Sequence, residues 1–153
     1  MSGHGLGTDV VTQIAIVVRD IERAVERYCA ILGLDRPDII ITDAYDQART
    51  TYRGEPTPAR AKLAFFQLGQ VALEVIEPVG GPSTWQEALE QKGEGVHHIA
   101  LVVPDTDAAT RSLGAHGINI VQQGYYTGGR YTYLDSQADL GVVLELLENF
   151  ASD

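Results

Sequence analysis

Four side chains that could bind a metal ion recur at matching points of two similar segments. One segment begins Gln13-Ile-Ala-Ile-Val-Val-Arg-Asp20, and the other begins His98-Ile-Ala-Leu-Val-Val-Pro-Asp105. Each segment later contains an apolar strand with a central carboxylate, Glu74 in 71–78 and Glu145 in 142–149. Amide oxygen, carboxylate oxygen and imidazole nitrogen all bind divalent transition metals. The repeat therefore indicates a metal site built from Gln13, Glu74, His98 and Glu145.

Strand periodicity places these four side chains on one face of a sheet. Successive side chains of a strand point to opposite faces. Gln13 shares its face with Ala15, whereas Ile14 and Ile16 face the other way, and the segment at His98 repeats this pattern. A carboxylate in the middle of an apolar strand is costly to bury unless it is paired or bound to a metal. We therefore expect the branched faces to pack under helices and the ligand faces to line a site.

The same alternation assigns three further polar residues to the opposite faces. His97 has the opposite parity to His98, so we expect it to pack under a helix or to bond to backbone. Glu77 and Glu148 have the opposite parity to Glu74 and Glu145, and we interpret both as surface residues at strand ends.

Each copy is expected to form a βαβββ module. The first module is predicted to contain strand 10–18, helix 21–32, and strands 37–43, 61–68 and 71–78; the second, strand 96–103, helix 106–116, and strands 118–123, 130–135 and 141–148. Asp20 and Gly33 are typical start and stop residues of the first helix. A short helix capped at Ser83 is predicted in the connector, and residues 44–60 are predicted to form a polar loop.

Length and composition limit the functional classes. The chain has 153 residues, which suits a single domain, a net charge of −10, and one cysteine. The negative charge argues against binding to nucleic acid, and no segment has the pattern of a membrane span or signal peptide. The lone cysteine fits a reducing cytoplasm. We divide the chain into a flexible leader (1–9) and one domain (10–149), with module one at 10–78, a connector at 79–94 and module two at 95–149.

The chain resembles the vicinal oxygen chelate superfamily, which includes glyoxalases, bleomycin resistance proteins and dioxygenases. The resemblance rests on the runs at 61–69, 93–100 and 141–148, and its nearest likeness is to methylmalonyl-CoA epimerase-like proteins. It implies an α+β fold in which two tandem βαβββ modules form a curved mixed sheet that cups a metal. It also places the metal ligands at Gln13, Glu74, His98 and Glu145.

This ligand set predicts a reaction class. Two carboxylates, an amide and an imidazole suit one divalent ion, namely Zn, Ni, Co or Mn. A substrate with two vicinal oxygens could chelate the ion, which would stabilise the negative charge left when a neighbouring proton is removed. We expect a metal-dependent isomerase, epimerase or lyase with Glu145 as the first choice of base and Glu74 as the second. The alternative is a non-catalytic small-molecule binding or resistance protein of the same fold.

Arginines and tyrosines of the irregular segments are the candidates for substrate binding, because loops commonly carry specificity. They are Tyr45, Arg49, Tyr52, Arg53, Arg60, Tyr126 and Arg130. Trp85 either closes the site or anchors the connector helix. We expect a small-molecule substrate, no nucleic-acid or membrane partner, a homodimer, and a cytoplasmic location.

Overall fold

The computed structural model describes residues 5–151, which form one ten-stranded mixed sheet with five helices. The strands are β1 (Gln13–Val17), β2 (Ile40–Ile41), β3 (Thr51–Tyr52), β4 (Glu55–Pro56), β5 (Arg60–Leu68), β6 (Val71–Val79), β7 (Gly95–Val102), β8 (Ile120–Tyr126), β9 (Gly129–Leu134) and β10 (Val143–Asn149). The helices are α1 (Ile21–Leu32), α2 (Tyr45–Ala48), α3 (Thr84–Lys92), α4 (Thr106–Gly114) and α5 (Gln137–Leu140).

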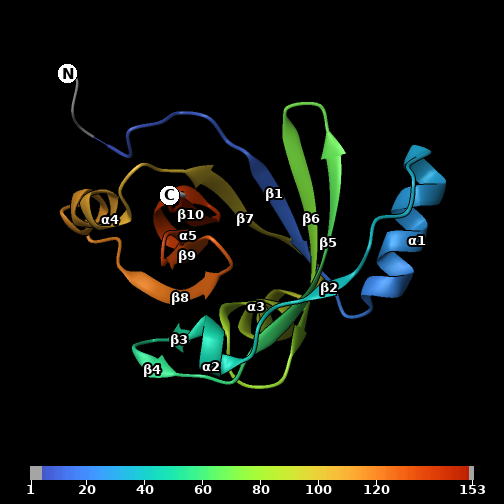
Figure 1. The fold of residues 1–153 in the computed structure, drawn as a ribbon, viewed down its shortest axis with the longest axis horizontal. Coiled ribbons are helices and arrows are strands. Elements are labelled where there is room, and N and C mark those ends of the chain that lie inside the picture. Colours follow the sequence, from blue (N-terminus) through green and yellow to red (C-terminus); the bar gives the residue numbers. More distant parts are fainter. Residues whose placement is uncertain (1–4, 152–153) are drawn as a thin grey trace.

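The two predicted βαβββ modules are confirmed, and they meet through their first strands. The order across the sheet is β2-β5-β6-β1-β7-β10-β9-β8-β3-β4. β1 pairs with β6 and β7 pairs with β10 in parallel, whereas β1 and β7 pair antiparallel at the junction of the modules. The strands that carry the four predicted ligands are therefore adjacent at the centre of the curved sheet (Figure 1).

The two long helices begin in the same way in each module. The Asp20 carboxylate accepts from Arg23 N at the start of α1, and Asp105 accepts from Ala108 N at the start of α4. α1 ends at Gly33, which adopts the left-handed conformation with φ 68°. Figure 1 shows α1 and α4 at opposite sides of the molecule.

Both helices cover the branched faces of the central strands, as predicted. Val25 of α1 packs with Leu73 and Val75 of β6, the neighbours of Glu74 that point to the other face. Ala109 of α4 packs with Leu144 and Leu146, which flank Glu145 in the same way. The faces that carry the predicted ligands therefore lie on the concave side of the sheet.

Glu77 and Glu148 are more than strand-end surface residues. Glu77 Oε1 accepts from the backbone N of Ile21, the first residue of α1, at 2.9 Å. Glu148 Oε1 accepts from the backbone N of Thr106, the first residue of α4, at 2.8 Å. Free N–H groups and a partial positive charge at a helix start favour a carboxylate there. The last long strand of each module therefore anchors that module's helix.

The segment 44–60 does not form a loop alone, and this prediction is wrong. It contains α2, β3 and β4, and β3 pairs antiparallel with β8 of the second module. β2, just before this segment, pairs with β5 of the first module. The chain thus crosses from one end of the sheet to the other and brings Thr42, Asp43 and Thr50 to the concave side. Local sequence shows only that the segment is polar, because its strand pairing depends on distant partners.

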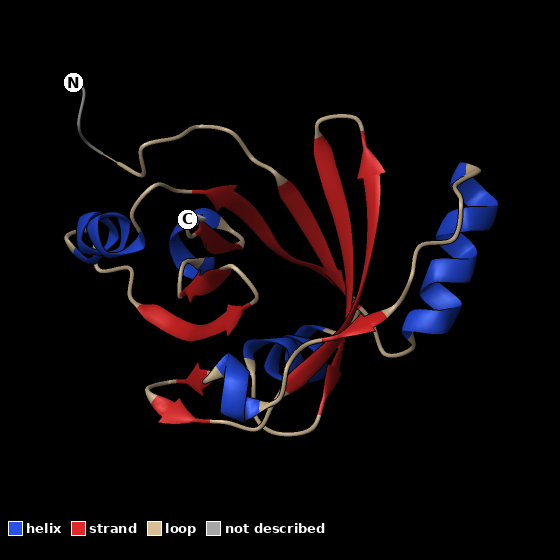
Figure 2. Cartoon of the chain, viewed as in Figure 1, coloured by secondary structure: helices blue, strands red, loops and turns tan. Residues whose placement is uncertain are grey.

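The connector helix α3 occupies one end of the concave side, between the two halves of the molecule (Figure 2). The Ser83 hydroxyl accepts from Gln86 N, so the predicted cap is confirmed. Trp85 and Leu89 of α3 pack with Ala15, Ile76 and Tyr133 in a core cluster on the ligand side of the strands.

Residues 1–4 of the predicted leader lie outside the described residues. Leu6 packs partly against the cluster under α4. Within residues 5–151, no helix has both the length and the apolar character needed to span a lipid bilayer.

Candidate functional site

Three of the four predicted ligands converge at the centre of the sheet. One ligand atom each from Glu74, His98 and Glu145 lies within 4.8 Å of the other two. His98 Nε2 is 3.3 Å from Glu74 Oε1 and 3.1 Å from Glu145 Oε1. Glu74 belongs to β6 of the first module, whereas His98 and Glu145 belong to β7 and β10 of the second. The cluster therefore lies between the two modules of a single chain.

The strand register explains this convergence. Glu74 pairs with Ala15 of β1, and Ala15 pairs on its other side with His98 of β7. Glu145 pairs with Ala100, two residues beyond His98. Ala15 and Ala100 are fully buried on the ligand face, and their small side chains leave room for the longer groups beside them. The alanines that accompany the ligands in sequence thus create the space for the cluster.

The three atoms fit a shared cation. Glu74 Oε1, His98 Nε2 and Glu145 Oε1 are buried, and none makes a well-aligned hydrogen bond within residues 5–151. Ligand atoms about 2.1 Å from a common ion lie about 3.0–3.4 Å apart in tetrahedral or octahedral geometry. The two distances from His98 Nε2 agree with this spacing. Two carboxylates and one imidazole would also balance the charge of a divalent ion.

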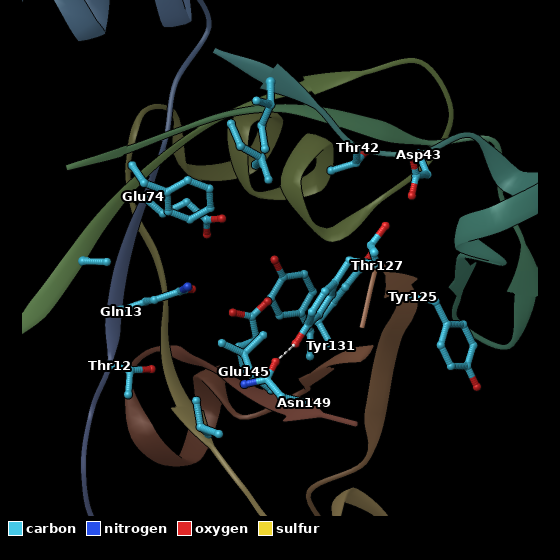
Figure 3. Close-up of a pocket in the computed structure, with 18 of the residues that line it drawn as sticks. Thr12, Gln13, Thr42, Asp43, Glu74, Tyr125, Thr127, Tyr131, Glu145 and Asn149 are labelled. Carbon is cyan, nitrogen blue, oxygen red and sulfur yellow. Dashed lines mark hydrogen bonds between the residues drawn. The ribbon is translucent and has the colours of Figure 1, made fainter. Parts of the chain in front are cut away.

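Gln13 faces the same space. It lines the cavity above the cluster, and in Figure 3 its amide points between Glu74 and Glu145. Gln13 pairs with Ala100 of β7, which places it opposite the strand that bears His98. The structure therefore brings all four predicted ligands to one region of the concave face.

The residues of the cluster shift one another's pKa values. Burial raises the pKa of Glu74, although the nearby His98 opposes this shift. Burial also disfavours the charged form of His98, but the carboxylates of Glu145 and Glu74 outweigh it and raise the pKa of His98 to about 10. The raised pKa favours a proton on His98 that faces the two glutamates, and a bound cation would replace that proton.

His97 lies on the same side as His98, contrary to the prediction from parity. The register between β1 and β7 shifts after Ala15, which pairs with His98, so that Ile16 pairs with Val96 and His97 has no partner on β1. Such a bulge inserts one extra residue and redirects the side chains around it. His97 does lie near a helix, but this helix is α3 on the concave side, at Thr84.

This bulge gives His98 a hydrogen-bond partner. His97 Nδ1 and His98 Nδ1 are 2.8 Å apart, and both residues are buried. Burial, followed by the charge on His98, lowers the pKa of His97 to about 3. A neutral His97 can accept the proton on His98 Nδ1, which leaves His98 Nε2 facing the glutamates. Histidines that bind metals commonly donate their other ring N–H in this way.

A cavity of about 610 Å³ opens above the cluster (Figure 3). Glu74 and Glu145 line its floor, whereas His98 is fully buried behind them. Aromatic side chains form part of its wall, including Trp85 of α3, whose Nε1 donates to Tyr133 Oη at 3.0 Å. Trp85 therefore both closes the cavity and anchors α3. The sequence alone could not show that Trp85 is buried at this site.

Most of the arginines and tyrosines predicted to bind substrate lie outside this cavity. Tyr126 does line it, as do Tyr125 and Tyr131 of the same irregular segment, and the Tyr126 hydroxyl donates to Asn149 Oδ1. Tyr52 and Arg53 both bond to Glu87 of α3. The remaining members lie elsewhere: Arg49 over the Tyr45 ring, Arg60 with Nε bonded to Thr42 O, and Arg130 paired with Asp107 and Glu148.

Residues that the sequence did not single out take the place of these arginines. Thr42 and Asp43 lie along one side of the cavity, and Thr12 lies on another (Figure 3). Their role depends on the path of segment 44–60 and on the curvature of the sheet, so no local sequence pattern could have identified them.

Comparison with known proteins agrees with this geometry. A 2-epi-5-epi-valiolone epimerase from an Actinomyces species is 29% identical over 96% of this chain and 84% of its own length. A methylmalonyl-CoA epimerase whose structure was solved in complex with methylmalonyl-CoA and NH4+ is 25% identical, with a TM-score of 0.64 over 92% of this chain and 94% of its own. The Mycobacterium tuberculosis methylmalonyl-CoA epimerase has a TM-score of 0.66 and 24% identity over 99% of this chain and 94% of its own.

The family model for the glyoxalase/bleomycin resistance protein/dioxygenase superfamily matches residues 12–133. This match includes β1, β6 and β7 and therefore three of the four strands that carry the predicted ligands. The resemblance inferred from the repeated runs is thus confirmed, and the chain belongs to the glyoxalase/bleomycin resistance protein/dioxygenase superfamily.

Proposed function

We propose that this protein is a metal-dependent epimerase that moves a proton at a carbon atom next to a carbonyl group. The observation that carries the proposal is the buried Glu74–His98–Glu145 cluster at the floor of an open cavity. The similarity to epimerases supports the same reaction class.

Glu74, His98 and Glu145 would hold the ion, with Gln13 as a fourth ligand. A divalent ion bound there would act as a Lewis acid that makes the neighbouring C–H bond of the substrate more acidic. His97 would keep His98 in the tautomer that presents Nε2. The packed walls around the glutamates would limit the access of water to the reacting carbon.

The two glutamates would share the proton transfer. Glu145 accepts the proton from one face of the substrate carbon, and the electron pair of the broken bond stays on the substrate. Glu74, which comes from the other module, would take up a proton from solvent and deliver it to the opposite face, so the configuration would invert. This division uses the origin of the two carboxylates, because Glu74 belongs to β6 of one module and Glu145 to β10 of the other. Both carboxylates would thus serve as metal ligands and as proton-transfer groups.

Metal content and proton exchange test this function together. The purified protein should contain about one divalent ion per chain by elemental analysis, and His98→Ala should lose most of it. Glu77→Gln is the matched control, because Glu77 lies on the same strand as Glu74 but bonds to α1 on the other face. NMR in deuterated water should show exchange of a substrate C–H proton. Tight binding of candidate substrates without any exchange would instead favour the non-catalytic binding protein.

Replacing each glutamate with glutamine separates metal binding from proton transfer. Glutamine keeps an oxygen ligand but cannot accept a proton at neutral pH. Glu145→Gln should retain part of the metal and lower the exchange rate by ~100-fold or more, the size of a lost general base. Glu74→Gln should lower the exchange rate less, because Glu145 still removes the proton, but it should abolish inversion, because glutamine cannot return a proton to the opposite face. The reverse ranking would make Glu74 the base.

A further inference from the structure

The charges around the cavity limit the substrates that it can hold. Of the described residues that line the cavity, the charged ones are Asp43, Glu74 and Glu145, and none is a lysine or an arginine. A divalent ion would balance Glu74 and Glu145 but would leave Asp43 uncompensated. An anionic substrate would thus bring a second negative charge into a partly buried site that offers no cationic side chain.

The arginines nearest to this region are engaged elsewhere. Arg130 pairs with both Asp107 and Glu148, so its charge is already balanced. Arg60 Nε donates to a backbone carbonyl, that of Thr42, and its side chain is not part of the cavity lining. Arg49 and Arg130 line a separate cavity of about 230 Å³, which shares Tyr125 with the large one. A charged group at the reacting carbon would therefore meet no counter-charge except the metal.

The groups that do line the cavity suit a neutral, oxygen-rich molecule. They include the hydroxyls of Thr12, Thr42 and Thr127 and the side-chain amide of Asn149. Hydroxyls both donate and accept hydrogen bonds, so they match substrate hydroxyls without adding charge. Phe65 and Trp85 supply flat apolar surface against which the carbon face of a ring can pack. A volume of about 610 Å³ accommodates a compact ring.

We propose that the substrate is an uncharged, polyhydroxylated cyclic hydroxy ketone, rather than an anionic acyl thioester. This inference rests on the proposed epimerase function, because the vicinal oxygens of the hydroxy ketone would bind the ion. Asp43 then acts as a selectivity residue that repels anions and accepts hydrogen bonds from substrate hydroxyls.

Binding to the Co²⁺-loaded protein tests this substrate class. The probes are pentahydroxycyclohexanone (inosose), which is neutral, and methylmalonyl-CoA, which is anionic, and the visible absorption of Co²⁺ reports their binding. We expect inosose to bind at least ~10-fold more tightly, because one uncompensated charge interaction in such a site costs about that much. Tighter binding of methylmalonyl-CoA, or equal binding of both probes, would overturn the proposal.

Asp43→Asn provides the sharper test, with Asp46→Asn of α2 as the matched control outside the cavity lining. Asp43→Asn should improve the affinity for methylmalonyl-CoA by ~10-fold relative to inosose, and the gain should shrink at high salt. Asp46→Asn should leave the ratio unchanged. An equal response of the two variants would show that Asp43 does not select against anions.

Proton exchange separates this proposal from the proposed function. If methylmalonyl-CoA binds more tightly and exchanges its C–H proton, the epimerase function stands and the neutral substrate class fails. If inosose binds at the metal but no proton exchanges at its carbons under any condition, the substrate class stands and the epimerase function fails.

Discussion

At the scale of single residues, the properties of the site depend on His98 and the groups that contact it. Nε2 of His98 lies between Glu74 and Glu145, whereas Nδ1 contacts His97. The same imidazole therefore meets two acids on one side and a neutral base on the other. The protonation state of His98 decides whether Nε2 carries a proton or is free to bind a metal ion.

Metal affinity should depend on pH over an unusually wide range. The pKa of His98 is raised to about 10 in the absence of metal, so below that pH the ion must displace one proton. The apparent affinity for Mn²⁺ should therefore rise about tenfold per pH unit from pH 7 to pH 9 and level off near pH 10. Chelator competition at several pH values measures this slope. An affinity that is constant above pH 7 would mean that His98 has an ordinary pKa.

Removing the hydrogen-bond acceptor that His97 provides to His98 should lower the metal affinity, although no metal ligand is lost. His97→Phe preserves an aromatic ring but cannot accept the proton on His98 Nδ1. Loss of such a partner typically lowers metal affinity by about 10–100-fold. His97→Asn, which retains an acceptor, should lose less. Equal affinity of His97→Phe and the wild type would reduce His97 to a packing residue.

At the scale of elements, each module attaches its long helix to its last strand by a partly buried hydrogen bond. Glu77 holds the first N–H of α1, and Glu148 holds the first N–H of α4. The hydroxyl and the backbone N–H of Thr106, followed by the Arg130 guanidinium, lower the pKa of Glu148. Glu145 lies on the same strand, three residues before this anchor.

Glu148→Ala should destabilise the protein but leave the metal site intact. The change removes a charged acceptor at the start of α4 and one partner of Arg130, which together are worth about 1–2 kcal/mol. Urea unfolding of the metal-free protein measures this loss, with the exposed Glu26→Ala of α1 as the control. Because the carboxylate must be ionised, the difference should shrink as the pH falls through the lowered pKa of Glu148. Loss of metal would instead show that α4 positions Glu145.

At the scale of the whole molecule, one chain supplies every residue of the cluster. The junction between β1 and β7 brings the modules together, and the cluster takes Glu74 from one and His98 and Glu145 from the other. A homodimer remains a prediction, but the assembly of the cluster does not require one.

The metal content should therefore not depend on the oligomeric state. Analytical ultracentrifugation of the Co²⁺-loaded protein over a range of concentrations should give about one ion per chain in every species. A loss of Co²⁺ that follows dissociation would show that a second chain contributes a ligand. Glu145→Ala provides the metal-free reference.

The sequence alone determined the repeat, its strand parity and the quartet Gln13, Glu74, His98 and Glu145. These could be predicted because side-chain alternation and helix caps depend on neighbouring residues. Only the tertiary structure decided the bulge at His97, the crossing of segment 44–60, and the exclusion of the arginines from the cavity. These features arise from pairing between residues far apart in the chain and from the curvature of the sheet, which local patterns do not encode.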